Sequence, residues 1–244
     1  MEDRRSQHLF GLGALAVGLL IGLLAISQSL KDIRRGNEEV AVTGSARRSI
    51  RSDFVVWRLS VSVQSSSLTS ASQELSRGVD RVRAFLKAEG IPDSQLTVKP
   101  VEASGVPEFT PEGRETGRII ASRVAQLIEV RSADIDGITR TSQRVGALIA
   151  EGIPVAPQSP EYLYTKLGEI RTALLEEATK DARQRAEAIV RSTGGTIGAV
   201  RDARMGVFQI TPRYSTEVSD YGINDVTSIE KDVTAVVRAT FTIR

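Results

Sequence analysis

Hydrophobic and polar residues alternate in several stretches of this chain, the pattern expected of half-buried β-strands. In residues 55–63, Val55, Trp57 and Leu59 fall on one side, and polar residues such as Arg58 fall on the other. Alternation and apolar content predict further strands from Val40 onward and over residues 95–101, 118–131, 196–210 and 232–243. The chain therefore has enough strands to build one or more sheets.

Between these strands, apolar residues three and four positions apart predict amphipathic helices. The helices are expected to begin at Leu68, Asp134 and Tyr164 and to end near Gly90, Ala150 and Arg191. Asp134 and Asp136 open the second helix, where acidic side chains interact favourably with the helix dipole, and we prefer this interpretation to a metal site. The third helix carries Ala178, Ala182 and Ala186 on one face, which permits close packing against a sheet or another helix.

One pentapeptide occurs twice. The sequence Ala-Glu-Gly-Ile-Pro ends the first helix at residues 88–92 and the second helix at residues 150–154. Glycine terminates helices well, so shared capping chemistry alone could produce the repeat. The similar strand–helix–strand surroundings raise a second interpretation, that the domain contains two related halves. In either case the predicted fold class is α+β, with amphipathic helices packed on one or more sheets.

A stretch without charged residues precedes this domain. Residues 9–26 are rich in Leu, Ala, Gly, Val and Ile, and a helix of about 18 residues is roughly 27 Å long, close to the thickness of a bilayer core. A cleaved signal segment is the alternative, but the apolar run is longer than usual for one. The expected organisation is a flank at 1–8, a transmembrane helix at 9–30, a tether at 31–39 and one domain at 40–244.

Small residues recur within the predicted membrane helix. Ala14, Gly18 and Gly22 lie four positions apart and therefore share one helix face. Such a face lets two membrane helices approach closely, although Gly and Ala are also common in membrane helices in general. We consider these residues candidates for helix packing in the bilayer.

Composition excludes several chemistries. Lys plus Arg total 32 and Asp plus Glu total 30, and the charges are interleaved, so no basic surface for nucleic acid is expected. The chain has no cysteine, which excludes thiol catalysis, Cys-ligated metals and disulfides. Its single histidine, His8, precedes the apolar segment, so a Ser-His-Asp triad in the domain is impossible. We expect no metal, cofactor or catalytic residue, and no enzymatic activity.

Two polar segments with aromatic residues are the candidate binding surfaces. The first is a Pro/Gly/Glu-rich loop expected at 103–117, which contains Phe109. The second is a loop expected at 211–229, which carries Tyr214 and Tyr221 and follows Phe208 and Gln209. Aromatic residues on long loops are typical of binding surfaces, but they can also cover the ends of a sheet. The candidate interface residues are Phe109, Phe208, Gln209, Tyr214 and Tyr221.

Several short motifs occur together in an order typical of one family. They are Val-Thr-Gly at 42–44, Tyr-Thr-Lys-Leu at 164–167, Ala-Thr-Lys-Asp-Ala-Arg-Gln-Arg-Ala-Glu at 178–187, Gly-Val-Phe-Gln-Ile at 206–210 and Ser-Ile-Glu-Lys-Asp-Val at 228–233. Across residues 40–244 the chain resembles the SIMPL-domain family of bacterial envelope proteins. The resemblance implies an α+β domain that is usually periplasmic or exported. It further implies a tendency to form large homo-oligomers and a link to stress tolerance, and it supplies no catalytic residues.

Three functional hypotheses follow from these features of the sequence. The favoured one is a non-enzymatic scaffold or ring, anchored in the bacterial inner membrane with its domain in the periplasm, in which copies of the chain self-associate. The second is an adaptor that binds another envelope protein or a ligand through the two loops. The third is an enzyme that uses carboxylates or tyrosines. The expected partners are thus the lipid bilayer, further copies of the chain and an envelope protein, and not nucleic acid.

Overall fold

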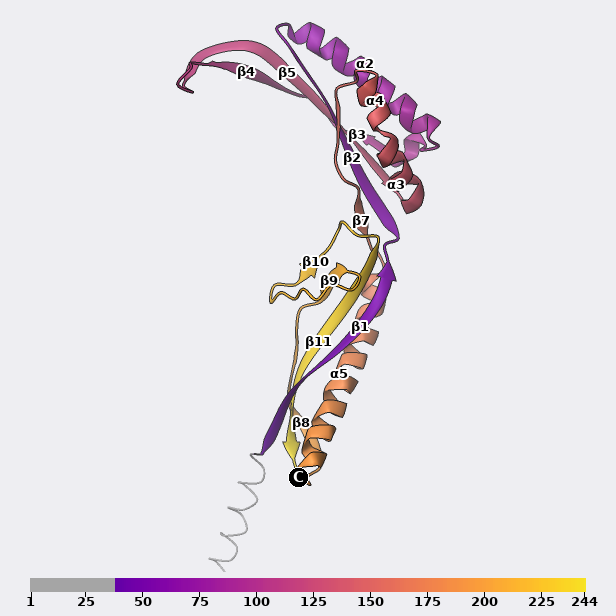
Figure 1. Cartoon of the computed structure of the whole chain (residues 1–244), viewed down its shortest axis with the longest axis vertical. Coiled ribbons are helices and arrows are strands. Elements are labelled where there is room, and N and C mark those ends of the chain that lie inside the picture. The colour runs from indigo at the N-terminus through magenta and orange to yellow at the C-terminus, as the bar shows by residue number, and fades with distance from the viewer. Residues whose placement is uncertain (1–37) are drawn as a thin grey trace, which may run out of the picture. The chain divides into compact units, whose positions relative to one another are not determined.

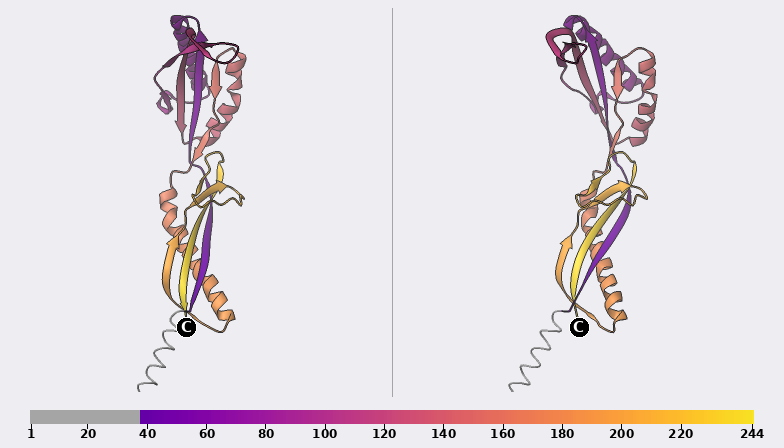
Figure 2. Two further views of the ribbon diagram at one scale, coloured as in Figure 1. Left: turned by 90° about the vertical axis from the view of Figure 1, so that its left-hand side faces the viewer. Right: turned by 60° about the vertical axis from the view of Figure 1, so that its left-hand side comes forward.

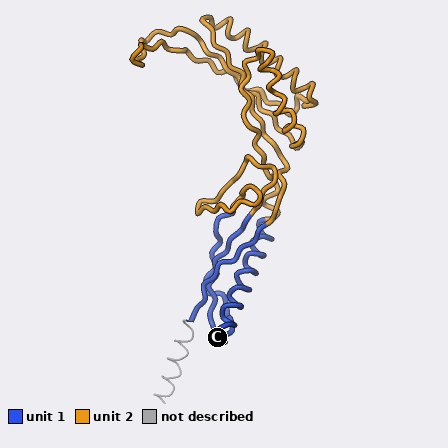
Figure 3. Tube along the Cα trace, in the orientation of Figure 1, with its two compact units in different colours: residues 1–47, 171–208, 234–244 blue, residues 48–170, 209–233 orange. Residues whose placement is uncertain are grey.

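A computed structural model describes residues 38–244 as a mixed α+β protein, which confirms the predicted fold class. The described chain divides into two compact units, shown in separate colours in Figure 3. The predicted anchor at 9–30 lies outside the described residues. Within residues 38–244, no helix combines the length and apolar character needed to cross a membrane.

Unit 2 comprises residues 48–170 and 209–233 and contains a six-stranded sheet. The central path of this sheet is β3 (Leu96–Val98), β5 (Glu115–Ser132), β2 (Phe54–Ser65) and β6 (Val155–Pro157). Beside it, β4 (Glu102–Phe109) pairs with β5, and β7 (Glu161–Leu163) pairs with β2. All of these pairings are antiparallel.

The chain order around this sheet is strand–helix–strand, twice. A helix α2 (Leu68–Ala88) and a short 3-10 turn (Asp93–Gln95) connect β2 to β3, while α3 (Ile135–Arg144) and α4 (Gly146–Ala150) connect β5 to β6. Since β5 lies between β2 and β3, and β2 lies between β5 and β6, this is the split βαβ arrangement of ferredoxin-like domains. The two matching sections noticed in the sequence are therefore interleaved in one sheet.

The helices cover one face of this sheet, as Figure 1 shows. Val55, Trp57 and Leu59 of β2 are fully buried against α2 and α3, together with Ile128 of β5. The predicted alternation along β2 is thus correct, and its second set of side chains lies on the outer face, away from the helices. The Trp57 ring donates a hydrogen bond to the Gln158 carbonyl at 2.9 Å, which satisfies its buried N–H.

The repeated pentapeptide ends two helices in the same way. Gly90 and Gly152 have φ angles of 87° and 80°, a conformation that glycine adopts without steric cost. In the first copy the Ile91 amide bonds the Leu86 carbonyl, and in the second the Ile153 amide bonds the Leu148 carbonyl, both at 3.0 Å. Both copies lie in unit 2, so the repeat marks equivalent helix ends on one sheet.

Unit 1 comprises residues up to 47 together with 171–208 and 234–244. Its sheet contains parts of β1 (Glu39–Arg51) and β11 (Glu230–Ile243), with β8 (Ile197–Met205) antiparallel to β11, and one face is covered by α5 (Leu167–Ser192). The views of Figure 2 show α5 lying along these strands. The same sheet continues with β9 (Gln209–Pro212) and β10 (Ile223–Asn224), which belong to unit 2.

The alanine stripe of α5 packs directly on the sheet. Ala178, Ala182 and Ala186 are completely buried, as the sequence predicted. Opposite them, a Cβ built on Gly44 of β1 would lie 2.2 Å from the Ala178 carbonyl oxygen. The Asp181 carboxylate also accepts a hydrogen bond from the Ser45 amide at 2.8 Å, and this bond lowers its pKa. The backbones of α5 and β1 are therefore in direct contact.

Three sequence predictions need correction. The expected strand at 196–210 is two strands, because β8 ends at Met205 and β9 begins at Gln209. The second helix is divided at Val145 into α3 and α4. The loop expected at 103–117 is largely strand, since β4 and the start of β5 form a hairpin there. Proline and glycine suggested a loop at this place, but backbone pairing with a long neighbouring strand outweighs their low β-propensity.

Replacement of Gly44 tests the backbone contact. Gly44→Ala should lower the free energy of unfolding by about 1–3 kcal/mol, because α5 must move to admit the methyl group. Urea unfolding followed by circular dichroism measures this change. Gly168→Ala in the first turn of α5 is the control, since its Cβ would meet nothing within 4 Å, and it should leave stability unchanged or slightly raised. Equal stability of all three proteins would contradict the tight contact.

Candidate functional site

The hairpin of β4 and β5 extends from unit 2 as a curved ribbon, which we call the arm (residues 102–122; Figure 1). Both strands of the arm are mostly exposed, in contrast to the buried part of β5 that follows. Phe109 is 56% exposed, Ile119 is 59% exposed and Ile120 is also exposed. A two-stranded ribbon has little stability of its own in water. The arm thus presents apolar side chains that no other described residue covers.

Local hydrogen bonds give the arm a defined tip. The Thr110 amide bonds the Arg114 carbonyl at 2.8 Å, and Gly113 completes the turn with a φ of 80°. Across the two strands, Glu108 accepts a hydrogen bond from Thr116 at 2.9 Å and forms an ion pair with Arg118. The tip is therefore an ordered structure that can hold Phe109 in place.

The outer edge of β4 is poorly suited to pairing with another strand. β4 pairs only with β5, and its register shifts on both sides of Pro107. Proline lacks the amide donor that a sheet ladder needs, and bulges bend a strand away from regular pairing. Contacts of the arm with a partner are therefore expected through side chains and not through strand addition.

A second exposed surface is the tyrosine loop, residues 213–222 between β9 and β10. Tyr214 and Tyr221 are 80% and 98% exposed, and Val218 lies exposed between them. Tyr214 has a φ of 65°, an unusual conformation for a residue other than glycine. Its amide donates to Asp232 at 3.3 Å, and the Arg213 guanidinium lies 5.0 Å from the centre of its ring. These contacts hold the backbone while the ring remains accessible.

Two of the predicted interface residues do not belong to this exposed surface. Gln209 is only 6% exposed, and its Nε2 donates to the Ser219 carbonyl at 2.7 Å. It therefore supports the tyrosine loop from beneath and is not part of the exposed surface. Phe208 lies in unit 1, where the Arg171 guanidinium is 5.4 Å from its ring centre.

The other three candidates, Phe109, Tyr214 and Tyr221, are exposed as expected, on two separate segments. Ala14, Gly18 and Gly22 lie outside the described residues.

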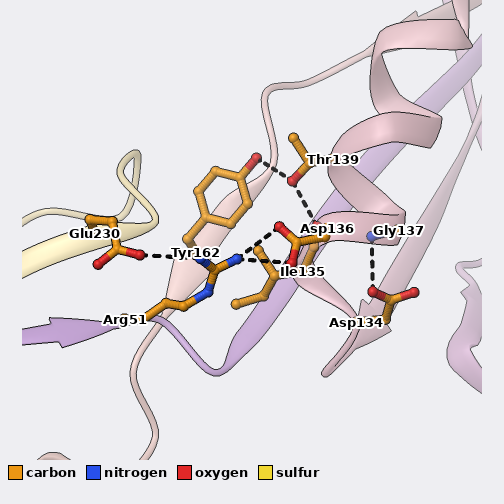
Figure 4. Close-up of polar contacts among 8 residues, drawn as sticks. All are labelled: Arg51, Asp134, Ile135, Asp136, Gly137, Thr139, Tyr162 and Glu230. Carbon is orange, nitrogen blue, oxygen red and sulfur yellow. Dashed lines mark hydrogen bonds and ion pairs between the residues drawn. The ribbon is translucent and has the colours of Figure 1, made fainter.

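Polar contacts in unit 2 join segments that are distant in sequence (Figure 4). Arg51 forms two hydrogen bonds with Asp136, at 2.8 and 2.9 Å, and a further one with Glu230 at 3.2 Å. Asp134 caps α3 by accepting from the Gly137 amide at 2.9 Å, as predicted from the sequence. Because each carboxylate here has a structural partner, this cluster joins β1, β11 and α3.

Lys231 is the deepest charged residue of this region. Its side chain is 1% exposed, and its Nζ donates to the Tyr162 carbonyl at 2.6 Å and to the Asp225 carbonyl. Burial lowers the pKa of Lys231, and the nearby Asp225 carboxylate partly offsets this effect. The Tyr162 hydroxyl in turn bonds Thr139 at 2.9 Å. Lys231 therefore links β11, β7 and the segment after β10.

On the outer face of the sheet, a second buried charge lies between two arginines. Glu129 of β5 is buried, and its two carboxylate oxygens accept from Arg58 at 2.9 Å and from Arg131 at 2.7 Å. Burial by itself would raise the pKa of Glu129, but the two guanidinium groups outweigh this effect and hold it below its usual value. Arg58 also binds Glu161 at 2.7 Å, so Arg131, Glu129, Arg58 and Glu161 form a linear chain of ion pairs.

Beside this charge chain the outer face is hollowed. The hollow has a volume of about 500 Å³, and Ser60, Ala125 and Leu127 line it together with Gln158. Lys99 and Glu102 stand at its rim, where the chain passes from β3 to β4. We call this feature the outer-face hollow. It was not predicted from the sequence, because the alternation of β2 identifies two faces without showing which one remains uncovered.

No group of three or more potential metal ligands occurs among residues 38–244. The buried Lys231 and Glu129 bind carbonyls and guanidinium groups and do not face a common pocket. The arrangement that the structure does provide is two ordered, exposed segments that carry aromatic or aliphatic side chains, a composition typical of protein interfaces.

Lys231 could have been found from the sequence. Val233, Ala235 and Val237 share the buried face of β11, and Lys231 continues this alternation by one step. The strand was predicted to begin at Asp232, which left Lys231 outside it. The signal that was missed is a lysine at the next alternating position of a buried strand face.

Glu129→Gln should destabilise the protein at neutral pH. The loss of charge-assisted hydrogen bonds is expected to cost about 1–3 kcal/mol in urea unfolding. Because the folded-state pKa is lowered, this stabilisation is complete above the ordinary carboxyl pKa and disappears as the pH falls through the folded-state value. The difference between the two proteins should therefore shrink below about pH 4. Glu161→Gln, at a more exposed carboxylate, should cost less; a pH-independent difference would contradict this account.

Comparison with known proteins identifies a family for most of the chain. The sequence profile described as "SIMPL: Protein of unknown function (DUF541)" matches residues 40–241. No curated protein matches the chain. A solved structure titled "De novo designed protein Foldit4" is similar at 18% identity with a TM-score of 0.25, over 43% of this chain and 93% of the designed one. Because the family profile extends from the start of β1 nearly to the end of β11, the chain belongs to the SIMPL family.

Proposed function

We propose that this protein is a non-enzymatic envelope scaffold that assembles as a homo-oligomer, anchored in the bacterial inner membrane by residues 9–30 with its SIMPL domain in the periplasm. The proposal rests on the exposed apolar side chains of the arm. Its two strands expose Phe109, Ile119 and Ile120 to solvent within the described residues. A ribbon of this kind gains stability when another surface covers its apolar side chains.

Self-association suits a protein whose copies share a membrane. Anchoring confines the chains to two dimensions, and the raised effective concentration makes weak lateral contacts effective. The arm is defined by its own turn and cross-strand bonds, so little further ordering is needed when it binds. A role in stress tolerance would follow from the mechanical or organising function of such an assembly.

The tyrosine loop supports a second candidate function, an adaptor for another envelope protein. Tyr214 and Tyr221 are exposed on a backbone held by Asp232 and by Gln209. Rigid, exposed tyrosines contribute a large contact area at a low entropic cost. This loop and the arm are separate segments of unit 2, so the two functions can be tested independently.

Molecular mass provides the test of the scaffold. Light scattering after size exclusion should give one large, discrete oligomer both for the detergent-solubilised full-length protein and for a chain beginning at Asn37. Monomers in both preparations would overturn the scaffold proposal. An oligomer of the full-length protein alone would assign assembly to the N-terminal segment and not to the SIMPL domain.

Single substitutions identify the surface that is used. Phe109→Ser in the full-length protein should reduce the oligomer mass or raise the concentration needed for assembly at least about tenfold, a typical loss for an interface aromatic. Tyr221→Ser is the matched control, since this ring is still more exposed but lies on the tyrosine loop. If Tyr221→Ser dissolves the oligomer and Phe109→Ser does not, the arm has no part in assembly.

A further inference from the structure

We propose that the tip of the arm in one copy docks into the outer-face hollow of a second copy. This inference rests on the proposed self-assembly and specifies its contact. The two surfaces lie on the same unit but serve different roles, one as an insert and one as a receptor. The contact is therefore heterologous, and repetition of it produces a ring or a filament.

The hollow has a floor suited to an apolar insert. Ala125, Leu127 and Ser60 line the hollow, and the register of the sheet pairs Ser60 with Leu127, so these small or aliphatic side chains share the outer face. The volume of about 500 Å³ exceeds what one aromatic side chain needs, and it leaves room for the turn that carries the side chain. Phe109, at the end of β4 beside the tip, is the insert that the arm offers.

Charges of opposite sign complete the match. Lys99 and Glu102 at the rim of the hollow form no hydrogen bond or ion pair through their side chains within the described residues. At the arm tip the side chains of Glu112 and Arg114 are likewise unpaired in the described chain. Docking brings Lys99 against Glu112 and Glu102 against Arg114, so that each charge acquires a partner. Complementary charges at the edge of a contact set its register and orientation.

The construction of β4 disfavours strand addition at its edge of the arm. An exposed hairpin commonly associates by adding a strand at its edge. Pro107 lies in β4, and the pairing of β4 with β5 shifts register on both sides of it, so this edge is irregular. A side-chain contact made by the tip requires no free edge, and it uses the part of the arm where the hydrogen-bonded turn fixes the geometry.

The absence of cysteine makes crosslinking a clean test. Two full-length variants are prepared, Pro111→Cys at the exposed tip and Gln158→Cys at the rim of the hollow; both leave the four charges in place. The two variants are mixed as monomers, or their subunits are allowed to exchange in detergent. The mixture is then treated with a short bismaleimide. The expected product is a crosslinked dimer in the mixture that neither variant gives alone. Val218→Cys on the tyrosine loop replaces Gln158→Cys in the control mixture and should give no such product.

The outcomes separate the docking from the proposed function. A crosslink from Pro111→Cys alone would indicate a symmetrical tip-to-tip contact and overturn the docking. A discrete oligomer by light scattering with no crosslink in the mixture would also overturn it, while self-assembly would stand. Monomers by light scattering would remove both proposals.

Charge reversal tests the pairing of Lys99 with Glu112. Lys99→Glu in the Gln158→Cys chain should lower the crosslinked fraction severalfold, and Glu112→Lys in the Pro111→Cys chain should restore it. When the Pro111→Cys chain with Glu112→Lys is mixed with the Gln158→Cys chain that keeps Lys99, the crosslinked fraction should fall. A crosslink that responds to neither reversal would overturn this docking geometry. Circular dichroism of each variant checks that these exposed substitutions leave the fold unchanged.

Discussion

Much of unit 2 depends on the hydrogen bonds that the buried ammonium group of Lys231 donates. A buried cation is expensive, and only well-placed acceptors offset the loss of water. Here the acceptors are the Tyr162 and Asp225 carbonyls, which belong to β7 and to the segment after β10. One side chain therefore holds together strands that are far apart in sequence. The tyrosine loop leaves the sheet just before this point, so its position depends on the same anchor.

The functional surfaces arise from an incomplete covering of the unit 2 sheet. Helices α2 and α3 cover one face, where Trp57 and Leu59 are buried. The outer face combines a linear chain of ion pairs around Glu129 with the outer-face hollow. Where β5 continues beyond the helices, it has only β4 beside it, and the arm results. The arm thus follows from a strand that continues past the end of β2, and the hollow lies on the sheet face opposite the helices.

Periodicity predicted the parts of the fold that are built on one repeating pattern. The buried face of β2, the alanine stripe of α5 and the Asp134 cap of α3 follow from local sequence, and the structure confirms each. The arm was misjudged because Pro107 and nearby glycines locally favour a loop, whereas pairing with β5 is a long-range effect. Gln209 is buried, and a polar residue next to aromatics gives no local signal of burial. Pairing of distant segments cannot be read from the composition of either one.

Pro107 has a consequence for how copies of the chain meet before they are fully folded. Newly made chains at high local density risk zipping together along free strand edges, which leads to amyloid-like aggregates instead of a finite assembly. A proline in β4 and two register shifts in its pairing with β5 disfavour such a zipper along the β4 edge. If the arm mediates the proposed assembly, this interruption would limit misfolding during biogenesis while the arm stays exposed.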